Sequence, residues 1–181
     1  MIAEKFEIEG LILIEPDVFS DARGFFFESY NTQKYENIIP GVSFFQDNIS
    51  KSCKNTLRGL HYQVGESAQG KLCQVIFGEV LDVAVDIRFS SPTFGKYQAV
   101  VLSSENRKQF WIPPGFAHGF AVLSDEAIFM YKCTSFYSKK DERCIIYNDP
   151  DLKINWGIEN PVISEKDLMG RRFKDIDKDF E

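Results

Sequence analysis

Short stretches in which hydrophobic and polar residues alternate follow one another along most of the chain. The clearest covers residues 80–87, where all four odd-numbered positions are apolar while Asp82 and Asp86 fall on the opposite face of a strand. Similar patterns predict further strands at residues 11–14, 25–30, 42–50, 57–62, 72–77, 96–102, 109–112, 119–123, 127–134 and 145–147.

Turn-forming residues separate these stretches at short intervals, at 91–92, 104–106, 113–115, 124–125 and 149–150. Asn31 is expected to cap a short helix that runs to Ile38, and residues 164–167 are expected to form a second short helix or turn. Many short strands with such punctuation predict an all-β jelly-roll sandwich or barrel with a few short helices. A length of 181 residues fits one domain over residues 1–181.

The formal net charge of −6 gives no overall field that would attract nucleic acid or an anionic membrane. No apolar run is long enough to cross a bilayer, and the acidic first ten residues do not resemble a signal peptide. Cys53, Cys73, Cys133 and Cys144 form no C-x-x-C pair and lie in apolar segments, so we expect buried free thiols. These features predict a cytoplasmic protein without a nucleic-acid or membrane partner.

One stretch, RGLHYQ at 58–63, places one of only two histidines beside an arginine in a strand-like context. Gly59 inside this strand indicates a bulge or a close approach of another backbone. Lys71 begins the next apolar strand. An imidazole, a guanidinium and an ammonium that meet in one pocket would suit an anionic substrate and proton transfer.

Other chemistries find less support in the chain. Small metal-binding β-barrels often carry a His-x-His pair, but the corresponding residues are His61, Tyr62 and Gln63, and only His118 follows, in PGFAH at 114–118. We therefore expect no metal. The chain has no G-x-S-x-G nucleophile motif and no glycine-rich phosphate loop. Acid–base chemistry by His61 stays open, as does a purely structural role for this strand histidine.

A series of motifs then points to one family. The motifs are DARGFFFESY at 21–30, FQDNIS at 45–50, RGLHYQ at 58–63, DVAVDIR at 82–88, SPTFGK at 91–96, IPPGFAHGF at 112–120, YKCTSFY at 131–137 and ISEKD at 163–167. With them the chain resembles the dTDP-4-dehydrorhamnose 3,5-epimerase family, over nearly its whole length and in the family's order and spacing.

The resemblance implies a cupin-type fold and an isomerase that works without cofactor or metal. Its substrate would be the dTDP-linked 4-keto-6-deoxy sugar dTDP-4-dehydro-6-deoxy-D-glucose, which it would invert at C3 and C5 during dTDP-L-rhamnose biosynthesis, a supply route for carbohydrates such as lipopolysaccharide O-antigen. It further implies a homodimer in which N-terminal strands of one subunit reach into the partner's site.

The family motifs also assign roles to residues. His61 would be the catalytic base, oriented by Asp167; Lys71 would stabilise the enolate; and Tyr131 would return a proton to the opposite face. The matching substrate-binding positions are Arg58 at the diphosphate, Arg23, Phe26 and Glu28 at the nucleotide across the dimer, and Gln46, Asn48, His118 and Tyr137 around the sugar.

Several alternatives stay open. Phe26 could be a core residue, Asp86 is expected in a structural ion pair, and Asp82 could support another site residue. The chain could instead epimerise C3 only, isomerise the 3,4-keto position, or bind a sugar without turnover. A metal-dependent dioxygenase is a further possibility, against which Gln63 speaks. Tyr131 and Tyr137 together favour the double epimerase.

Overall fold

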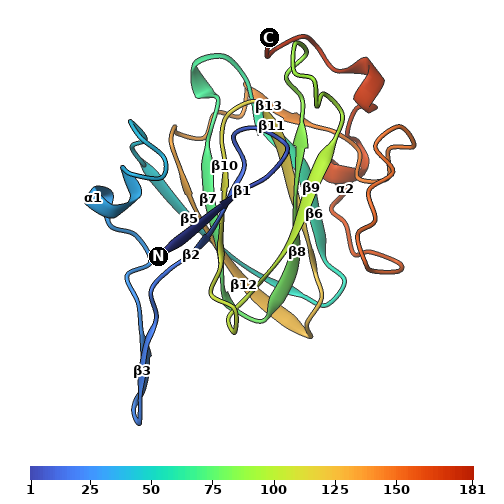
Figure 1. The fold of residues 1–181 in the computed structure, drawn as a ribbon. Coiled ribbons are helices and arrows are strands. Elements are labelled where there is room, and N and C mark those ends of the chain that lie inside the picture. The colour runs from blue at the N-terminus through green and yellow to red at the C-terminus, as the bar shows by residue number, and fades with distance from the viewer.

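In a computed structural model that describes all 181 residues, two antiparallel sheets face each other (Figure 1). The first sheet contains, in spatial order, β1 (Ile2–Lys5), β2 (Ile12–Glu15), β10 (Gln109–Ile112), β7 (Lys71–Phe77), β12 (Glu126–Cys133) and β5 (Gln46–Cys53). The second contains β13 (Glu142–Cys144), β6 (Leu57–Gln63), β11 (Phe116–Val122), β8 (Glu79–Asp86) and β9 (Tyr97–Ser103).

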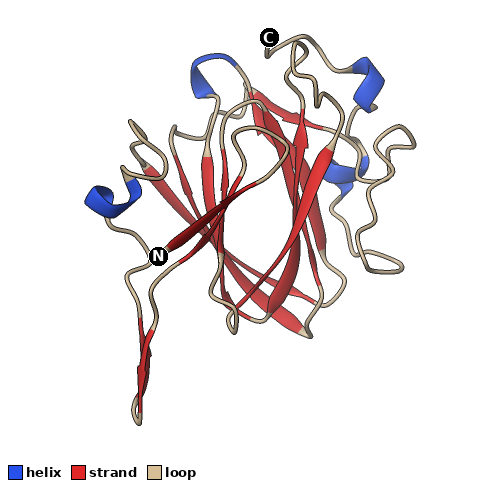
Figure 2. Ribbon diagram, in the orientation of Figure 1, coloured by secondary structure: helices blue, strands red, loops and turns tan.

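The remaining elements are short and lie around these sheets (Figure 2). Strands β3 (Phe19–Asp21) and β4 (Gly24–Phe26) form a hairpin that projects away from the body of the molecule. The helices are α1 (Thr32–Tyr35), α2 (Glu165–Leu168) and two 3₁₀ turns, η1 (Gly65–Ser67) and η2 (Phe173–Asp175). None of these helices has the length and apolar character needed to span a membrane.

Apolar side chains from both sheets meet between them and form the central core. Its large members are Phe110, Phe116, Phe120 and Phe129. The rings of Phe120 and Phe129 stack across the two sheets with centroids 4.3 Å apart. Because aromatic residues bury large apolar areas, this contact fixes the distance between the sheets on one side of the interior.

Additional layers cover the outer faces of both sheets. Leu152 and Trp156, together with apolar residues of the C-terminal segment, pack on the outside of the five-stranded sheet. Tyr35 and Ile39, from and just after α1, pack on the outside of the six-stranded sheet. This explains why the outward-facing residues Val83 and Val85 of β8 are buried, whereas Asp82 and Asp86 lie on the inner face of the same strand, where they are also fully buried.

The observed strands confirm the all-β prediction, with differences at several element boundaries. The strand expected at 145–147 is β13, three residues earlier, and the strand expected at 42–50 is β5, which begins at Gln46. Extended pairing after residue 24 stops at Phe26 rather than at residue 30. The predicted helix from Asn31 to Ile38 is only four residues long, although Asn31 caps it as expected. Strand β1 was not predicted.

The expectation that all four cysteines are buried is correct for Cys73 and Cys133 and wrong for Cys53, which is exposed. Cys144 is half-buried. Asp86 forms the predicted structural ion pair, with Arg88, and also accepts hydrogen bonds from Ser91 and Thr93. Phe26 is not a core residue, since 66% of its surface is exposed.

A β-bulge in β6 is the fold's most important irregularity. His118 of β11 pairs with His61 and Phe120 pairs with Arg58, so Gly59 and Leu60 together stand opposite the single residue Gly119. The extra residue puts Arg58 and His61 on the same face, although their odd spacing would put them on opposite faces of a regular strand. The bulge that Gly59 predicted is therefore confirmed.

Gly59 also has no room for a side chain. Its φ is +131°, and a Cβ would lie 2.5 Å from Gly119 Cα. Gly59→Ala should lower the free energy of unfolding by roughly 3–5 kcal/mol, because strained backbone and overpacking each cost about 1–3 kcal/mol. Urea unfolding measures this loss. Gly24→Ala is the matched control, since Gly24 has the same φ with nothing within 4 Å. Equal losses in the two variants would contradict the steric explanation.

Candidate active site

A cavity of about 270 Å³ opens between the two sheets and is lined mainly by polar side chains. The five-stranded sheet contributes Arg58, His61, His118, Gly119 and Phe120, and the six-stranded sheet contributes Asn48, Ile49, Ser50, Lys71 and Tyr131. Arg58 and Lys71 give the cavity two cationic groups, although the chain as a whole is acidic. This local charge suits an anionic ligand.

His61 is held by a carboxylate that lies behind it. Asp167, in α2, accepts a hydrogen bond from His61 Nε2 at 2.8 Å through Oδ1 and one from the Gly59 N–H at 3.1 Å through Oδ2. Ser164 caps α2 by accepting from the Asp167 N–H, which places the carboxylate. One carboxylate therefore orients the imidazole and also fixes the bulge from which the imidazole projects.

Burial acts to raise the pKa of Asp167, but the hydrogen bonds from His61, Gly59 and Ser164 hold that pKa below its ordinary value. Asp167 is thus ionised at neutral pH and His61 Nε2 carries the hydrogen. In a neutral imidazole with this tautomer, the second ring nitrogen, Nδ1, has a lone pair that can accept a proton.

The facing wall carries a phenol and an ammonium. Tyr131 of β12 packs against the central core, and burial raises its pKa to about 12, so the phenol is protonated at neutral pH. Lys71 Nζ lies 5.8 Å from the centre of the Tyr131 ring. A proton acceptor on one sheet and a proton donor on the other therefore face each other across one cavity.

Arg58, beside His61 on the five-stranded sheet, and Asn48, on the six-stranded sheet, complete the polar lining of the cavity. Arg58 Nε donates to Ser52 Oγ at 3.1 Å, which leaves the outer part of the guanidinium for a ligand. Asn48 and Gln46 alternate onto the same face of β5, as predicted, and Gln46 Nε2 donates to Asn48 Oδ1 at 3.0 Å.

A second imidazole–carboxylate pair lies deeper. His118 Nε2 donates to Asp82 Oδ1 at 2.6 Å, and Cys73 Sγ lies 3.8 Å from the same nitrogen. Burial lowers the pKa of His118, an effect that Asp82 opposes, so the ring is neutral. The sequence left the role of Asp82 open, and in the structure Asp82 orients the ring of His118.

Gln63 occupies the position at which metal-binding barrels have a second histidine, and its side chain forms hydrogen bonds with the backbone of the surrounding loops. Its Nε2 donates to the backbone carbonyls of Ser67 and Phe136 at 3.0 and 3.2 Å, and its Oε1 accepts from the Ser138 N–H at 2.6 Å.

Two clusters of side chains have the chemistry to hold a cation, and in each the ligand atoms lie within 4.8 Å of one another. One consists of His61, Cys144 and Asp167, and the other of Cys73, Asp82 and His118.

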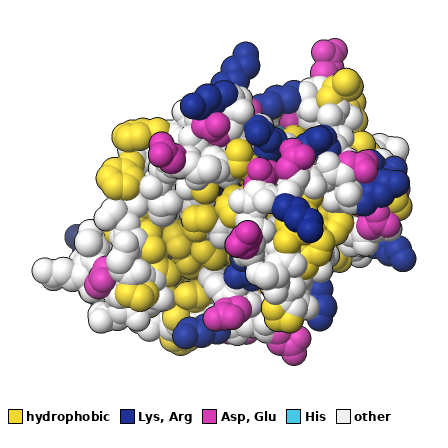
Figure 3. Space-filling view, turned by 90° about the horizontal axis from the view of Figure 1, so that it is seen from above, with side chains coloured by type: hydrophobic (Ala, Val, Ile, Leu, Met, Phe, Trp, Pro, Cys, Tyr) yellow, Lys and Arg dark blue, Asp and Glu magenta, His cyan; other side chains and the backbone are white.

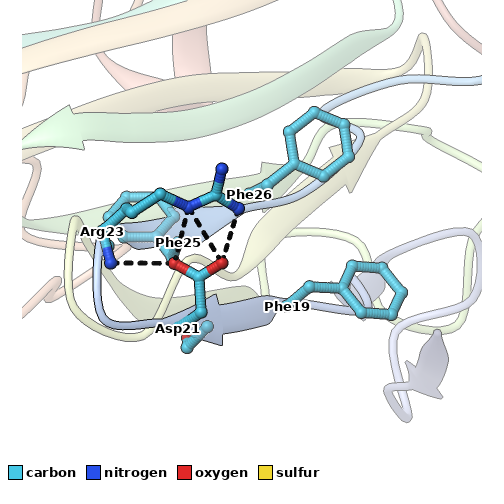
Figure 4. Close-up of a pocket in the computed structure, with 7 residues that line it drawn as sticks. Phe19, Asp21, Arg23, Phe25 and Phe26 are labelled. Atoms are coloured by element: carbon cyan, nitrogen blue, oxygen red, sulfur yellow. Dashed lines mark hydrogen bonds and ion pairs between the residues drawn. The ribbon is translucent and has the colours of Figure 1, made fainter.

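Three predicted nucleotide contacts lie outside the cavity of their own chain. Arg23 and Phe26 belong to the projecting hairpin, where Arg23 pairs with Asp21 at 2.6 Å and the aromatic side chains are exposed (Figure 4). Glu28 pairs with Lys34 and accepts from Asn31 beside α1. The structure therefore does not bring these three residues to His61 within one chain.

Tyr137 lies beside the cavity rather than in its wall. Its hydroxyl donates to Glu142 Oε2 at 2.9 Å, and Lys166 pairs with the same oxygen at 2.5 Å. The hydrogen bond to Glu142 raises the pKa of Tyr137. Sequence reasoning missed Glu142, because a charged residue in a segment of mixed charge carries no local signal of such a contact.

A two-sheet jelly roll in which an imidazole–carboxylate pair and a guanidinium on one sheet face a protonated phenol and an ammonium on the other has the groups of an enzyme that moves protons on an anionic substrate. Comparisons with known proteins agree with this class. The family model for dTDP-4-dehydrorhamnose 3,5-epimerase matches residues 5–175. The chain belongs to this family.

Individual relatives cover nearly the whole chain. The dTDP-4-dehydrorhamnose 3,5-epimerase of Shigella flexneri is 56% identical over 96% of both chains, and that of Pseudomonas aeruginosa is 54% identical over 98% of both. The crystal structure of the Legionella pneumophila dTDP-6-deoxy-D-glucose-3,5-epimerase in complex with dTDP-4-keto-L-rhamnose superimposes with a TM-score of 0.94, at 49% identity, covering 97% of this chain and 94% of that one. The predicted cupin-type fold is confirmed.

The lowered pKa of Asp167 predicts a pH-dependent stability. Asp167→Asn should lower the free energy of unfolding at pH 7 by about 1–3 kcal/mol, because it removes a charged hydrogen-bond acceptor. A carboxylate with a lowered folded pKa stabilises the fold above about pH 4, and this contribution is lost as the pH falls through the folded pKa. Urea unfolding at a series of pH values should therefore show the difference from the wild type shrinking below about pH 4.

Asp125→Asn is the control for this series, because Asp125 pairs with Lys54 on the surface and its side chain is 95% exposed. It should change stability little at any pH. A constant difference between Asp167→Asn and the wild type across the whole series would contradict the ionised state of Asp167.

Proposed function

We propose that this chain epimerises C3 and C5 of dTDP-4-dehydro-6-deoxy-D-glucose to give dTDP-4-dehydro-L-rhamnose, without a cofactor. The observation that carries the proposal is the single cavity in which His61 and Tyr131 project from opposite sheets. Inversion at carbon needs a proton removed from one face and another delivered to the other face. The two groups stand on the two sides that this chemistry requires.

His61 takes the proton from the carbon next to the C4 ketone, and the charge that forms on the imidazole is stabilised by Asp167. Electrons from the broken C–H bond move onto the C4 oxygen as an enolate. Lys71 offsets this negative charge, as an oxyanion-hole donor does. Tyr131 then delivers its proton to the opposite face, the ketone re-forms, and the two residues recover their starting protonation through solvent.

Binding groups surround this centre. Arg58, whose guanidinium lines the cavity, binds the diphosphate. Asn48, with Gln46 behind it, and His118 contact the sugar, and Tyr137 shapes how the ring sits. Both sheets and the C-terminal helix α2 contribute to this one site, which supports a single catalytic domain over residues 1–181. The four free cysteines support a reducing, cytoplasmic location.

We propose that the active form is a homodimer in which the N-terminal strands of one subunit complete the partner's site. The hairpin β3–β4 leaves Phe19, Phe25 and Phe26 exposed by 65, 54 and 66%. Hydrophobic side chains also gather in one broad area on the face of the molecule seen in Figure 3. Exposed apolar surface of this kind favours a protein interface. A two-fold axis would carry Arg23, Phe26 and Glu28 to the partner's cavity, where they contact the nucleotide.

Isotope exchange tests the reaction. The protein is incubated in D₂O with the 4-keto sugar nucleotide and no added metal, and C3 and C5 are followed by NMR. Deuterium should enter at both carbons, because each proton passes through solvent-exchangeable groups. Deuterium at C3 alone would contradict double epimerisation and favour a C3-specific enzyme.

His61→Ala should abolish exchange while leaving the affinity for dTDP nearly unchanged. Binding without any exchange in the wild type would indicate a non-catalytic sugar-binding protein.

Subunit mixing tests the completed dimer site. His61→Ala and the double variant Arg23→Ala/Phe26→Ala should each be strongly impaired, but the two chains refolded together should regain about one quarter of wild-type activity, since half of the dimers are mixed and each has one intact site. Mixing His61→Ala with Lys71→Ala is the control, because both defects lie in the body of the chain and no mixed dimer has an intact site. Failure of the first mixture to recover would mean that the hairpin serves its own chain.

A further inference from the structure

Cys144 lies beside the imidazole–carboxylate pair, and the proposed mechanism gives it no role. It is the residue of β13 that pairs directly with His61 of β6, so the two side chains share one face of the sheet. Its thiol, the Asp167 carboxylate and a His61 ring nitrogen all lie within 4.8 Å of one another. Three donor atoms from β6, β13 and α2 thus meet at one point.

Sulfur, nitrogen and oxygen donors of these types form the sites that Zn²⁺ and similar thiophilic cations prefer. Zn²⁺ bonds lie at about 2.0–2.3 Å, so ligand atoms around it are separated by more than the 2.8 Å between His61 Nε2 and Asp167 Oδ1. A small opening of this pair, with the thiol moving inwards, would admit the ion. We propose that His61, Cys144 and Asp167 form an inhibitory site for a thiophilic divalent cation.

Binding would exchange protons for the cation. The Cys144 thiol releases its proton to solvent and forms the S–metal bond, and the hydrogen on His61 Nε2 moves through solvent to Nδ1 while Nε2 binds the ion. The thiolate and carboxylate together balance the two positive charges, and a water completes the tetrahedron. His61 then has no lone pair left with which to take a proton from substrate.

Access distinguishes this cluster from the second group of potential ligands. Cys73 and Asp82 are fully buried and His118 is 6% exposed. The His61 side chain, by contrast, is 30% exposed. It lines both the 270 Å³ cavity and a second hollow of about 390 Å³, which Asp167 also lines. An ion from solvent can therefore reach His61.

The experiment titrates ZnCl₂ and CdCl₂ against the wild type, Cys144→Ser, and the controls Cys53→Ser and Cys73→Ser. Binding is read from the rise in the thermal unfolding midpoint and from the ultraviolet charge-transfer band of a cadmium–thiolate bond, and inhibition from the deuterium-exchange rate. Cys144→Ser should keep its basal activity, lose the charge-transfer band and need at least about tenfold more Zn²⁺ for inhibition. The two control variants should behave like the wild type. MgCl₂ should not inhibit, which excludes an effect through the substrate diphosphate.

Unchanged zinc sensitivity in Cys144→Ser, or a loss of sensitivity in Cys73→Ser instead, would overturn the site. Absence of both the band and the midpoint shift in the wild type would overturn it as well. The inhibition rests on the proposed role of His61 as base, whereas cation binding does not. Binding that requires Cys144 but leaves exchange unaffected would therefore keep the site and contradict the role of His61.

Discussion

The two hydrogen bonds accepted by Asp167 are the interaction on which the site depends. One carboxylate receives the Gly59 N–H and His61 Nε2, at 3.1 and 2.8 Å. The first contact holds the bulge that turns Arg58 and His61 to the same face of β6, and the second sets the orientation of the imidazole inside the cavity. In a regular strand, Arg58 and His61 would point to opposite faces of the sheet, and the guanidinium and the imidazole could not line the same cavity. Asp167 therefore holds both the bulge of β6 and the imidazole of His61.

The two-sheet architecture separates His61 from Lys71 and Tyr131, which the site also requires. His61 projects from the five-stranded sheet, whereas Lys71 and Tyr131 project from the six-stranded sheet, and the stacked Phe120 and Phe129 rings keep the sheets apart. Burial raises the pKa of Tyr131 to about 12, so the phenol is protonated at neutral pH, as the proposed role of a proton donor requires. In the proposed mechanism, Lys71 on the same sheet offsets the charge of the developing enolate. Burial of Tyr131 therefore serves the proton donor of that mechanism.

Sequence reasoning could find what local pattern encodes. Alternation predicted most strands, Asn31 and Ser164 signalled the helix starts that they cap, and Gly59 signalled the bulge. Contacts between distant residues left no such mark. Asp167 was connected with His61 only through a family resemblance, and its contact with Gly59, 108 positions away, was not predicted. Strand β13 was misplaced because Ile145 has strong strand character, although it packs in the outer layer while Cys144 pairs with His61. Because the position of β13 was not predicted, the sequence also carried no sign of Glu142 beside Tyr137 or of Cys144 beside the His61–Asp167 pair.

The use of Gln63 shows how this barrel differs from a metal-binding one. A histidine at that position would offer a second imidazole two residues from His61, on the same face of β6. Gln63 instead makes three hydrogen bonds to the backbone of Ser67, Phe136 and Ser138 and so closes two loops over the end of the strand. With its amide committed in this way, Gln63 cannot ligate an ion in the cavity without releasing those loops. In the proposed mechanism, stabilisation of negative charge on the substrate falls to Lys71, a cation that needs no ligand set and that leaves His61 free to exchange protons.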